Sequence, residues 1–519
     1  MPAPRPLVVR PTALRALADL VGAPAPEADP TVSGVTLDSR SVQAGDLYAA
    51  LPGAHVHGAS FAAQARDSGA VALLTDAAGA QLVTARGDTG PILVVSDPRA
   101  VLGAVSARIY GTEASGLRMV GVTGTNGKTT TAYLITSALE ALARPTGLIG
   151  TVETRIGGER IGSVRTTPEA PDLHAILAVM AERGLDTCVM EVSSHALAQH
   201  RVDGVRYDLA LFTNLSQDHL DFHRDMEHYF ATKADLFSPG RAARGLVCVD
   251  DAWGRRLAEE SEIPVVTLGV AADADWRVVV DPADPAAFQL VGEPTTMALR
   301  SNLPGDFNVT NTAMAAATLL LLGLSPREVQ EAVLADPHVP GRMEKVRAGD
   351  GPAPLAVVDY AHTPEAIRAA LAALRPATRG PLVCVTGAGG DRDRDKRDAM
   401  GRAAAEVADV VLITDDNPRS EDPAEIRAAL LAGALAVPRV ARGECRVLEV
   451  GDRREAIRAA CRWALDLSVE TGFAVTDATV AVVGKGHETG QEIDGVVHPF
   501  NDRDELKAAL VDLLDGGRS

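Results

Sequence analysis

A glycine-rich segment followed by a lysine and two threonines is the part of the sequence best suited to bind phosphate. It lies in MVGVTGTNGKTT, residues 119–130, between an apolar run and the helix-like stretch TTAYLITSALEAL. Gly124 and Gly127 allow backbone amides to curve around phosphate oxygens, and Lys128 adds a positive charge. The Thr129 hydroxyl is of the type that binds Mg²⁺ in such loops. We therefore predict a nucleotide-phosphate loop here, rather than a turn with an incidental lysine.

Three further polar side chains could form a metal centre. Glu191 follows the apolar run TCVM, and a carboxylate buried at the end of a strand is costly unless it is paired or bound to metal. His219 lies in LFTNLSQDHLDFH, and Lys233 lies in the helix-like YFATKADLF. Taken singly, His219 could equally cap a helix or pack in a core, and Lys233 could be a solvated side chain. The residue types alone leave these alternatives open.

The charge of the chain limits the classes of partner. Acidic residues number 69 and basic residues 50, which gives a formal net charge of −19. Non-specific nucleic-acid binding requires a basic surface, so we expect no nucleic-acid partner. The N-terminal residues contain no apolar run long enough for a signal peptide or a membrane span. We expect a monomeric cytoplasmic protein that is not inserted in a membrane, with its five cysteines reduced.

Short apolar runs rich in β-branched residues alternate with helix-like stretches along the chain, as in VVLITDDN and TVAVVGKG. This alternation is typical of parallel sheets covered by helices on both faces, where ligands bind beyond the carboxyl ends of the strands. The polar motifs follow such runs, in three blocks of an α/β chain. The predicted domains are a smaller N-terminal α/β domain (1–111), a central ATPase domain with a parallel sheet of the P-loop type (112–341) and a C-terminal Rossmann-like domain (342–519).

The order of the motifs resembles that of the Mur ligase family. The phosphate loop has Val122 where the strict phosphate-loop pattern has glycine, and in this form GTNGKTT is similar to the ATP loop of Mur ligases and folylpolyglutamate synthetases. Matching motifs follow in family order from Leu37 to Glu488. The resemblance implies an ATP-dependent ligase that forms an amide bond and uses Mg²⁺. The ATP-binding positions implied are Gly124, Thr125, Asn126, Gly127, Lys128, Thr129, Thr130, Asn311, Arg342 and Asp359.

The resemblance also implies a role for each of the three polar side chains. The family's counterparts of Glu191 and Thr129 hold one Mg²⁺, and the counterpart of His219 helps to hold a second. The counterpart of Lys233 is carbamylated by CO₂, which turns a cation into an anion whose oxygens suit hard cations. The catalytic residues implied are Lys128, Glu191, His219 and Lys233, and the metal ligands implied are Thr129, Glu191, His219 and Lys233 as its carbamate.

Further segments resemble the family's site for a nucleotide-linked peptide, UDP-N-acetylmuramoyl-L-alanyl-D-glutamate. They are TLDSRS in the N-terminal block, and RTTPE and EVSSHALAQHR in the central one. Arg201 suits a phosphate or carboxylate because its planar fork pairs with such anions, although an isolated arginine is usually exposed on a helix. The matching positions are Leu37, Ser39, Ala54, His55, Val56, Thr166, Thr167, Ser193, Gln199 and Arg201.

The C-terminal motifs resemble those that select the amino acid in the diaminopimelate-adding branch of the family. DNPR is the hallmark segment, and it could also be an ordinary turn because Asn-Pro favours turns. Diaminopimelate differs from lysine by a second carboxylate, which a bidentate arginine would recognise. The residues implied are Arg392, Asp416, Asn417, Pro418, Arg419, Gly484 and Glu488.

The reaction implied is the addition of diaminopimelate to the D-glutamate γ-carboxylate through an acyl phosphate, in peptidoglycan precursor synthesis. Two alternatives remain. The first is another ligase of the superfamily, either lysine-adding, D-alanyl-D-alanine-adding or a folylpolyglutamate synthetase, and DNPR and RTTPE argue against it. The second is a P-loop NTPase that ligates nothing. In such a protein Lys233, His219 and the DNPR segment would have no purpose.

Overall fold

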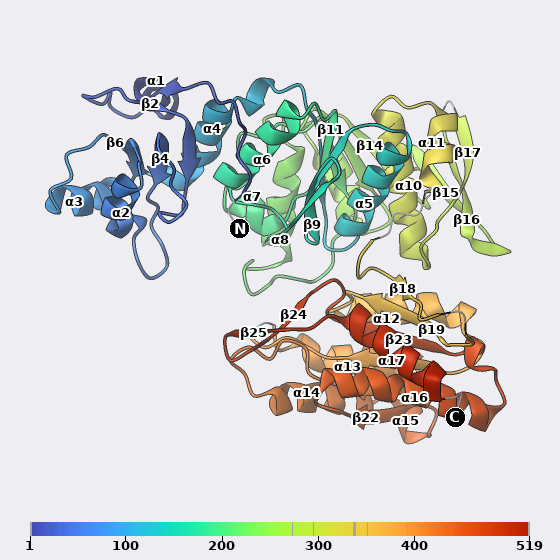
Figure 1. The fold of residues 1–519 in the computed structure, drawn as a ribbon. Coiled ribbons are helices and arrows are strands. Elements are labelled where there is room, and N and C mark those ends of the chain that lie inside the picture. Colours follow the sequence, from blue (N-terminus) through green and yellow to red (C-terminus); the bar gives the residue numbers. More distant parts are fainter. Residues whose placement is uncertain are drawn as a thin grey trace. The chain divides into compact units, whose positions relative to one another are not determined.

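The computed structural model describes residues 3–163, 165–271, 273–293, 295–335, 339–349, 351–391 and 393–516. The chain forms two compact units. The first contains Met1–Leu215, Glu227–Trp276 and Ala317–Ala332, and the second contains Ser216–Met226, Arg277–Ala316 and Val333–Ser519. Strands and helices alternate in both units, so the chain has the α/β fold predicted from its sequence (Figure 1).

The N-terminal part of the first unit contains a small parallel sheet and is drawn in blue in Figure 1. Its elements are β1 (Thr12–Ala13), α1 (Leu14–Val21), β2 (Thr31–Val32), β3 (Gly34–Thr36), β4 (Asp46–Ala49), α2 (Ala62–Asp67), β5 (Ala72–Thr75), α3 (Ala77–Ala85), β6 (Ile92–Val94) and α4 (Pro98–Tyr110). The sheet has the order β3-β4-β5-β6, with parallel neighbours. Leu47 of β4 joins a buried cluster with α1 and α4, whereas Tyr48 joins a cluster with α2. Side chains of a strand alternate between its faces, so helices cover both sides of this sheet.

A larger sheet in the first unit brings the phosphate loop and Glu191 together. Its elements are β7 (Arg118–Thr123), α5 (Lys128–Ala141), β8 (Thr146–Ile149), β9 (Glu153–Ile156), β10 (Glu159–Gly162), α6 (Ala170–Glu182), β11 (Thr187–Glu191), α7 (Ser194–Ala198), β12 (Leu209–Phe212), α8 (Met226–Ala234), β13 (Gly245–Cys248), α9 (Ala252–Glu260) and β14 (Val265–Gly269). The order is β10-β9-β8-β11-β7-β12-β13-β14, parallel from β8 to β14. Because β11, β7 and β12 are parallel neighbours, the segments that follow them meet at one edge.

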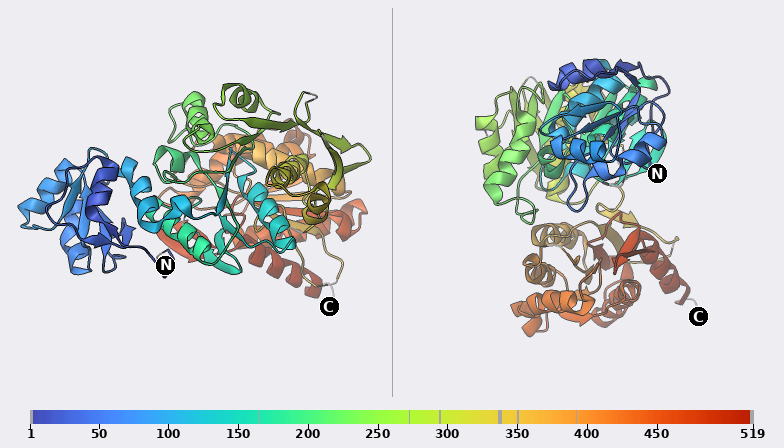
Figure 2. Two further views of the ribbon diagram at one scale, coloured as in Figure 1. Left: turned by 90° about the horizontal axis from the view of Figure 1, so that it is seen from above. Right: turned by 90° about the vertical axis from the view of Figure 1, so that its left-hand side faces the viewer.

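The second unit contains an antiparallel meander and a second parallel sheet, the latter drawn in orange and red in Figure 1 and Figure 2. The meander is formed by β15 (Trp276–Asp281), β16 (Asp284–Gly292) and β17 (Thr295–Arg300), and the chain continues through α10 (Asp306–Leu321) and α11 (Pro326–Val333). The parallel sheet has the order β18-β19-β23-β20-β21-β22, in which only β18 is antiparallel to its neighbour. The elements of this last part are β18 (Glu344–Val346), β19 (Leu355–Asp359), α12 (Pro364–Leu374), β20 (Leu382–Thr386), α13 (Lys396–Val407), β21 (Val410–Ile413), α14 (Pro423–Leu435), α15 (Pro438–Ala441), β22 (Arg446–Glu449), α16 (Arg453–Thr471), β23 (Thr479–Val483), β24 (Gly490–Ile493), β25 (Val496–Pro499) and α17 (Asp502–Gly516).

Two buried clusters lie on opposite faces of the second parallel sheet. One joins α12, α13 and α14 to alternate strand residues such as Cys384 and Val411. The other joins α16 and α17 to the intervening residues, such as Val383 and Val410. The five cysteines of the chain are buried as free thiols, as predicted. Among the residues that the structure describes, no helix is long and apolar enough to cross a membrane.

A buried ion pair fastens the start of α16 to the start of α17. Arg453 and Asp502 are both fully buried, with Nε 2.7 Å from Oδ1 and Nη2 2.8 Å from Oδ2. Arg453 Nη2 also donates to the carbonyl oxygen of Val483, at the end of β23. The two-pronged pairing satisfies both charges without water, and it fixes the helices beside the strand end that precedes Gly484.

We expect Arg453→Met to destabilise this part of the second unit by about 3–5 kcal/mol, because it leaves the Asp502 carboxylate buried without its counter-ion. The measurement is the free energy of opening of peptides from β23 and α16, obtained by hydrogen–deuterium exchange. Arg454→Met is the matched control, since Arg454 pairs with Glu505 at the surface and its loss should cost less than about 1 kcal/mol. Equal effects of the two substitutions would contradict the role given to the buried pair.

Candidate active site

The phosphate loop has the strand, turn and helix predicted for it. It leaves β7 after Thr123, and α5 begins at Lys128. Gly124 and Gly127 have φ angles of +142° and +88°, conformations that other residues rarely adopt. The Lys128 ammonium donates to the carbonyl oxygens of Gly124 and Thr125, both at 2.9 Å. The lysine thus lies across the loop, within reach of any phosphate that the loop binds.

Residues at the end of β12 hold the phosphate loop in shape. The Asn214 side chain accepts from the Asn126 amide at 2.9 Å, and its backbone carbonyl accepts from the Thr125 amide at 2.9 Å. The Thr213 hydroxyl donates to the carbonyl oxygen of Asn126 at 2.6 Å. Neither Thr213 nor Asn214 was among the predicted site residues. Their place in TNLSQDH, directly after an apolar strand, was the available signal.

Glu191 is fully buried at the end of β11 and accepts hydrogen bonds from two threonines. The Thr129 hydroxyl donates to its Oε2 at 2.9 Å. Thr151 approaches both carboxylate oxygens, with its amide 2.8 Å from Oε1 and its hydroxyl 3.0 Å from Oε2. An adjacent hydroxyl and carboxylate are the hard oxygen donors that Mg²⁺ prefers, so this pair fits the predicted ion. Thr151 is a further member of the site that the motifs did not indicate.

Lys233 lies beneath the phosphate loop. Its side chain is 1% exposed, and its Nζ donates to the carbonyl oxygen of Gly124 at 2.8 Å and lies 4.8 Å from the centre of the Tyr229 ring. The alternative of a solvated lysine is therefore wrong. Lys128 and Lys233 both donate to the same Gly124 carbonyl, so two cations lie side by side where the phosphates of a nucleotide are predicted to bind.

His219 belongs to the second unit, in the segment Ser216–Met226. Its backbone has a φ of +55°, and its Nε2 lies 3.6 Å from Asp218 Oδ2. Burial acts to raise the pKa of Asp218, but the nearby charges of His219 and His362 lower that pKa overall. Among the described residues no group of three or more His, Cys, Asp or Glu side chains is arranged to hold a metal. The role predicted for His219 in holding a metal stays a prediction.

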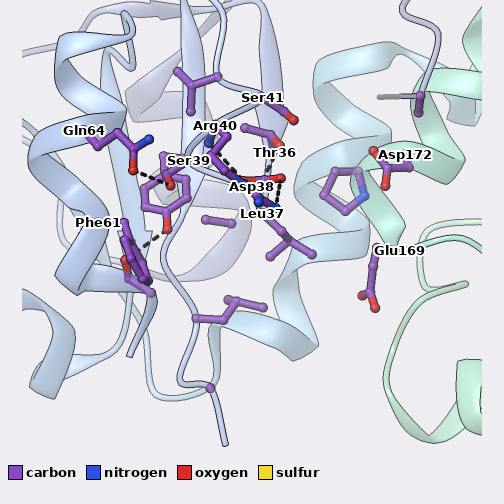
Figure 3. A pocket seen from close by; sticks show the side chains of 18 of the residues that line it. Thr36, Leu37, Asp38, Ser39, Arg40, Ser41, Phe61, Gln64, Glu169 and Asp172 are labelled. Carbon is purple, nitrogen blue, oxygen red and sulfur yellow. Dashed lines mark hydrogen bonds and ion pairs between the residues drawn. The ribbon is translucent and has the colours of Figure 1, made fainter. Parts of the chain in front are cut away.

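The N-terminal segment predicted to bind the nucleotide-linked peptide lines a cavity of about 1310 Å³ in the first unit. Leu37, Ser39 and Val56 lie in its wall, and Figure 3 shows the segment around Ser39 facing Gln64 on one side and Glu169 on the other. The Ser39 hydroxyl donates to the Gln64 side chain at 3.1 Å. Ala54 and His55 are exposed in the adjoining loop. A cavity of this size can hold a nucleotide sugar.

The central substrate segments lie next to Glu191. The Thr167 hydroxyl donates to the Glu191 backbone carbonyl at 2.8 Å, and the Thr166 hydroxyl lies 3.1 Å from that of Thr151. Ser193 caps α7 by accepting from the amide of Ala196. The structure therefore joins the predicted substrate loop, the predicted metal carboxylate and the phosphate-loop helix through one group of hydrogen bonds.

The predicted residues for the two nucleotide substrates include two arginines, Arg201 for the nucleotide-linked peptide and Arg342 for ATP. Arg201 follows α7, and its side chain is mostly buried, with Nη2 donating to Gln199 Oε1 at 2.5 Å. The alternative of an arginine exposed on a helix is therefore wrong. In the second unit, Arg342 lies over the Tyr360 ring at 4.3 Å.

The remaining ATP residues predicted in the second unit are Asn311, which is buried, and Asp359, which is half-buried. Asn311 Nδ2 donates to the Asn308 side chain at 3.2 Å. Asp359 accepts from the amides of Met343 and Ala361 at 2.7 and 2.9 Å. Burial raises the pKa of Asp359, although the charge of Arg342 opposes the shift. The roles of these residues in binding ATP stay predictions.

The DNPR segment presents Arg419 in a constrained backbone. Its φ is +52°, and the strand β24 holds it there, because the Arg419 amide donates to the carbonyl oxygen of Glu492 at 2.9 Å. Its Nη1 donates to the carbonyl oxygen of Gly390 at 2.6 Å, and its Nε lies 3.3 Å from Glu492 Oε2. A non-glycine residue with positive φ is often functional. Arg392, which was predicted to act with it, lies outside the described residues.

A buried lysine ties the other predicted diaminopimelate residues together. Lys485 is fully buried, and its Nζ donates to Asn417 Oδ1 at 2.9 Å and to Glu488 Oε2 at 3.0 Å. Asn417 Nδ2 donates to the same Glu488 oxygen at 2.8 Å. At Gly484 any side chain would meet Asp416, since an added Cβ would lie 2.7 Å from its Oδ2. Lys485 was not predicted, although a lysine directly after a buried strand in VVGKGHE was a signal for it.

Three successive parts of the chain match the sequence models of three domains of one protein family. Residues 31–110 match "Mur ligase family, catalytic domain", residues 122–319 match "Mur ligase middle domain", and residues 341–486 match "Mur ligase, glutamate ligase domain". Together they cover most of the chain, in the order in which its motifs occur.

Individual relatives match over almost the full length. A Streptomyces avermitilis protein named UDP-N-acetylmuramoyl-L-alanyl-D-glutamate–2,6-diaminopimelate ligase is 52% identical over 98% of each chain. A Leifsonia xyli protein named UDP-N-acetylmuramyl-tripeptide synthetase is 46% identical over 92% of this chain and 91% of its own. A solved structure of a ligase with the first of these names is 29% identical, covers 97% of this chain and 99% of its own, and has a TM-score of 0.64. By its sequence and its fold, the chain belongs to the Mur ligase family.

Proposed function

We propose that this chain is an ATP-dependent ligase that joins 2,6-diaminopimelate to UDP-N-acetylmuramoyl-L-alanyl-D-glutamate, a step of peptidoglycan precursor synthesis in the cytoplasm. The observation that carries the proposal is the hydrogen-bonded group around Glu191, which places the phosphate-loop helix beside the predicted substrate loop. A phosphoryl donor and a carboxylate acceptor could meet there. The name of the Streptomyces relative supports this choice of substrates.

The reaction has two steps. An oxygen of the D-glutamate γ-carboxylate attacks the γ-phosphorus of ATP, and the bond to ADP breaks. Lys128, which now donates to loop carbonyls, stabilises the charge that develops on the transferring group. An amine nitrogen of diaminopimelate then attacks the acyl carbon, phosphate leaves, and the nitrogen loses a proton. Thr129 and Glu191 would hold a Mg²⁺ ion, which offsets the charge of the phosphates.

Lys233 is proposed to act as its carbamate. Its neutral amine would add to CO₂ with loss of a proton, which replaces a cation by an anion with two oxygens suited to Mg²⁺. The support is electrostatic. The ammonium groups of Lys128 and Lys233 donate to the same Gly124 carbonyl, so two positive charges lie close together and repel each other. Carbamylation would convert this repulsion between Lys128 and Lys233 into attraction.

Selection of diaminopimelate is proposed to rest on charges of both signs at the DNPR segment. Arg419 would pair with the distal carboxylate, and Glu488, which Lys485 and Asn417 hold in place, would pair with an ammonium group. Because Glu492 already lies beside Arg419, the arginine keeps an anionic partner when lysine is bound. Discrimination then comes from the added pairing with diaminopimelate more than from a penalty on lysine.

The three predicted domains (1–111, 112–341 and 342–519) and the monomeric state belong to the same proposal. The three family matches, over residues 31–110, 122–319 and 341–486, support this division.

Lys128→Ala should lower the rate of ligation by at least about 1,000-fold, since a cation at the transferring phosphate is lost. The assay is phosphate release from ATP, which in the wild type should require both the nucleotide-linked dipeptide and diaminopimelate. Lys345→Ala, an exposed lysine on β18, is the control and should retain full activity. Release that is independent of either substrate would instead favour an NTPase that ligates nothing.

Lys233→Ala should be almost inactive and partly rescued by formate or acetate, which can supply the missing carboxylate oxygens. Lys128→Ala is the matched control, because a small carboxylate cannot replace a cation and should not rescue it. ¹³C NMR of the wild type under ¹³CO₂ should show one carbamate signal that is absent from Lys233→Ala. Without that signal and without rescue, the carbamate would have to be abandoned.

Arg419→Ala should reduce kcat/KM for diaminopimelate about 100-fold. The preference for diaminopimelate, which is its kcat/KM divided by that for lysine, should fall at least about 10-fold. The wild type should be assayed with meso- and LL-diaminopimelate, lysine and ornithine. Arg394→Ala is the control, because Arg394 is an exposed arginine in the loop before α13 and pairs with Glu421. If kcat/KM falls equally for diaminopimelate and lysine, so that the ratio is unchanged, Arg419 only stabilises the local backbone conformation. A wild type that prefers lysine would support the lysine-adding alternative.

A further inference from the structure

Three arginines from separate parts of the first unit converge on one carboxylate, that of Glu169 immediately before α6. Arg99 of α4 donates to Glu169 Oε2 at 3.1 Å. Arg165 of the substrate loop donates to Oε1 at 2.9 Å, and Arg201 places its Nε 3.0 Å from the same oxygen. We call Arg99, Arg165 and Arg201 the arginine cluster. One negative charge is therefore shared by three positive ones.

The single negative charge of Glu169 does not balance the three positive charges of the arginine cluster. Burial lowers the pKa of Arg201, and the charges of Arg165 and Arg99 lower it further, against the opposing effect of Glu169. The Arg201 Nε lies close to a Glu169 oxygen, but its N–H bond is not directed at that oxygen. In the described part of the chain no acceptor satisfies this buried N–H. A buried donor without an acceptor costs about 1–3 kcal/mol. An additional anion would remove this cost and reduce the repulsion.

Two members of the arginine cluster line the cavity in which the nucleotide-linked peptide is predicted to bind. Arg99, Arg165 and Glu169 line it together with Leu37 and Ser39. Figure 3 shows Glu169 across the cavity from the segment that contains Ser39. On that far side Asp38 is already paired with Arg40 at 2.9 Å. The excess of positive charge therefore lies on the Glu169 side.

A second carboxylate on the Glu169 side does not cancel this excess. Asp172 also lines the cavity, and burial followed by the charge of Glu169 raises its pKa, against the charges of Arg5 and Arg165. Glu169 and Asp172 together supply two negative charges against the three positive charges of the arginine cluster, and Arg5 is engaged by Asp46 at 2.7 Å. Arg99 and Arg165 thus remain the cationic groups of the cavity wall, and Arg201 shares their carboxylate partner.

We propose that Arg99 and Arg165, together with Arg201, form a subsite for an oxyanion of the nucleotide-linked substrate, either a phosphate or a carboxylate. Glu169 keeps the three guanidinium groups in position while the subsite is empty. When substrate binds, its anion accepts the hydrogen bonds that Glu169 alone cannot provide. The subsite rests on the proposed function, because that function supplies an anionic ligand for this cavity, and it adds two residues to those that the family resemblance indicates.

Arg99→Met and Arg165→Met, which keep the length of the side chain but remove the charge, should each raise KM for the nucleotide-linked dipeptide about 10-fold. The kcat and the KM values for ATP and diaminopimelate should change less than about 2-fold. Arg99→Lys should recover much of the loss. Arg108→Met, in the last turn of the same helix and outside the cavity lining, should behave as the wild type. Arg99→Met and Arg165→Met variants that fold and match Arg108→Met would overturn the proposal.

Calorimetry with UDP identifies the anion. If Arg99→Met weakens the binding of UDP as well as of the dipeptide substrate, the subsite holds a phosphate. If UDP binds unchanged while the dipeptide substrate is weakened, it holds a carboxylate. If neither ligand is weakened, the subsite does not exist. A wild type that binds UDP but ligates nothing would refute the proposed function, and the effect of Arg99→Met on UDP binding would then still test the subsite.

Discussion

The Glu191 carboxylate lies at the end of β11 without access to water, and such a group must be met by donors because its unpaired burial costs several kcal/mol. Thr129 and Thr151 supply these donors from the phosphate-loop helix and from the segment after β8. The backbone carbonyl of the same residue holds Thr167 of the substrate loop. One buried residue, through its carboxylate and its backbone carbonyl, thus contacts three segments that are distant in sequence. The edge of the parallel sheet is where they can meet.

The second unit uses buried charges in a similar way. Lys485 donates hydrogen bonds to Asn417 in one loop and to Glu488 in another. Arg453 fastens α16 to α17 beside the same strand ends. Each of these cations has partners in fixed positions, so the walls around the DNPR segment are rigid. Rigid placement of complementary charges favours a ligand that matches them without reorganisation.

Much of the fold follows from local patterns, because apolar β-branched runs ending in polar motifs are typical of buried parallel strands. The phosphate loop could be predicted for the same reason. The roles of Thr151 and Glu169 and the contact of Lys485 with Asn417 could not, since these contacts join segments that the sequence separates by 40 to 70 residues, as with Thr151 and Glu191 or Asn417 and Lys485. The burial of Lys233 was likewise hidden, because a helix position does not show what packs over it. Contacts of this kind arise from tertiary structure alone.

The buried cysteines have a practical consequence. Burial raises the pKa of Cys445 to about 11 and those of Cys248, Cys384 and Cys461 to about 12, and it also raises the pKa of Cys188. Thiolates, not thiols, react with maleimides and iodoacetamides. The native chain is therefore close to inert toward these reagents while it is folded. Two cysteines introduced at exposed positions, one in each unit, would carry fluorophores or spin labels selectively, so distances between the two units could be followed in solution without first removing any native residue.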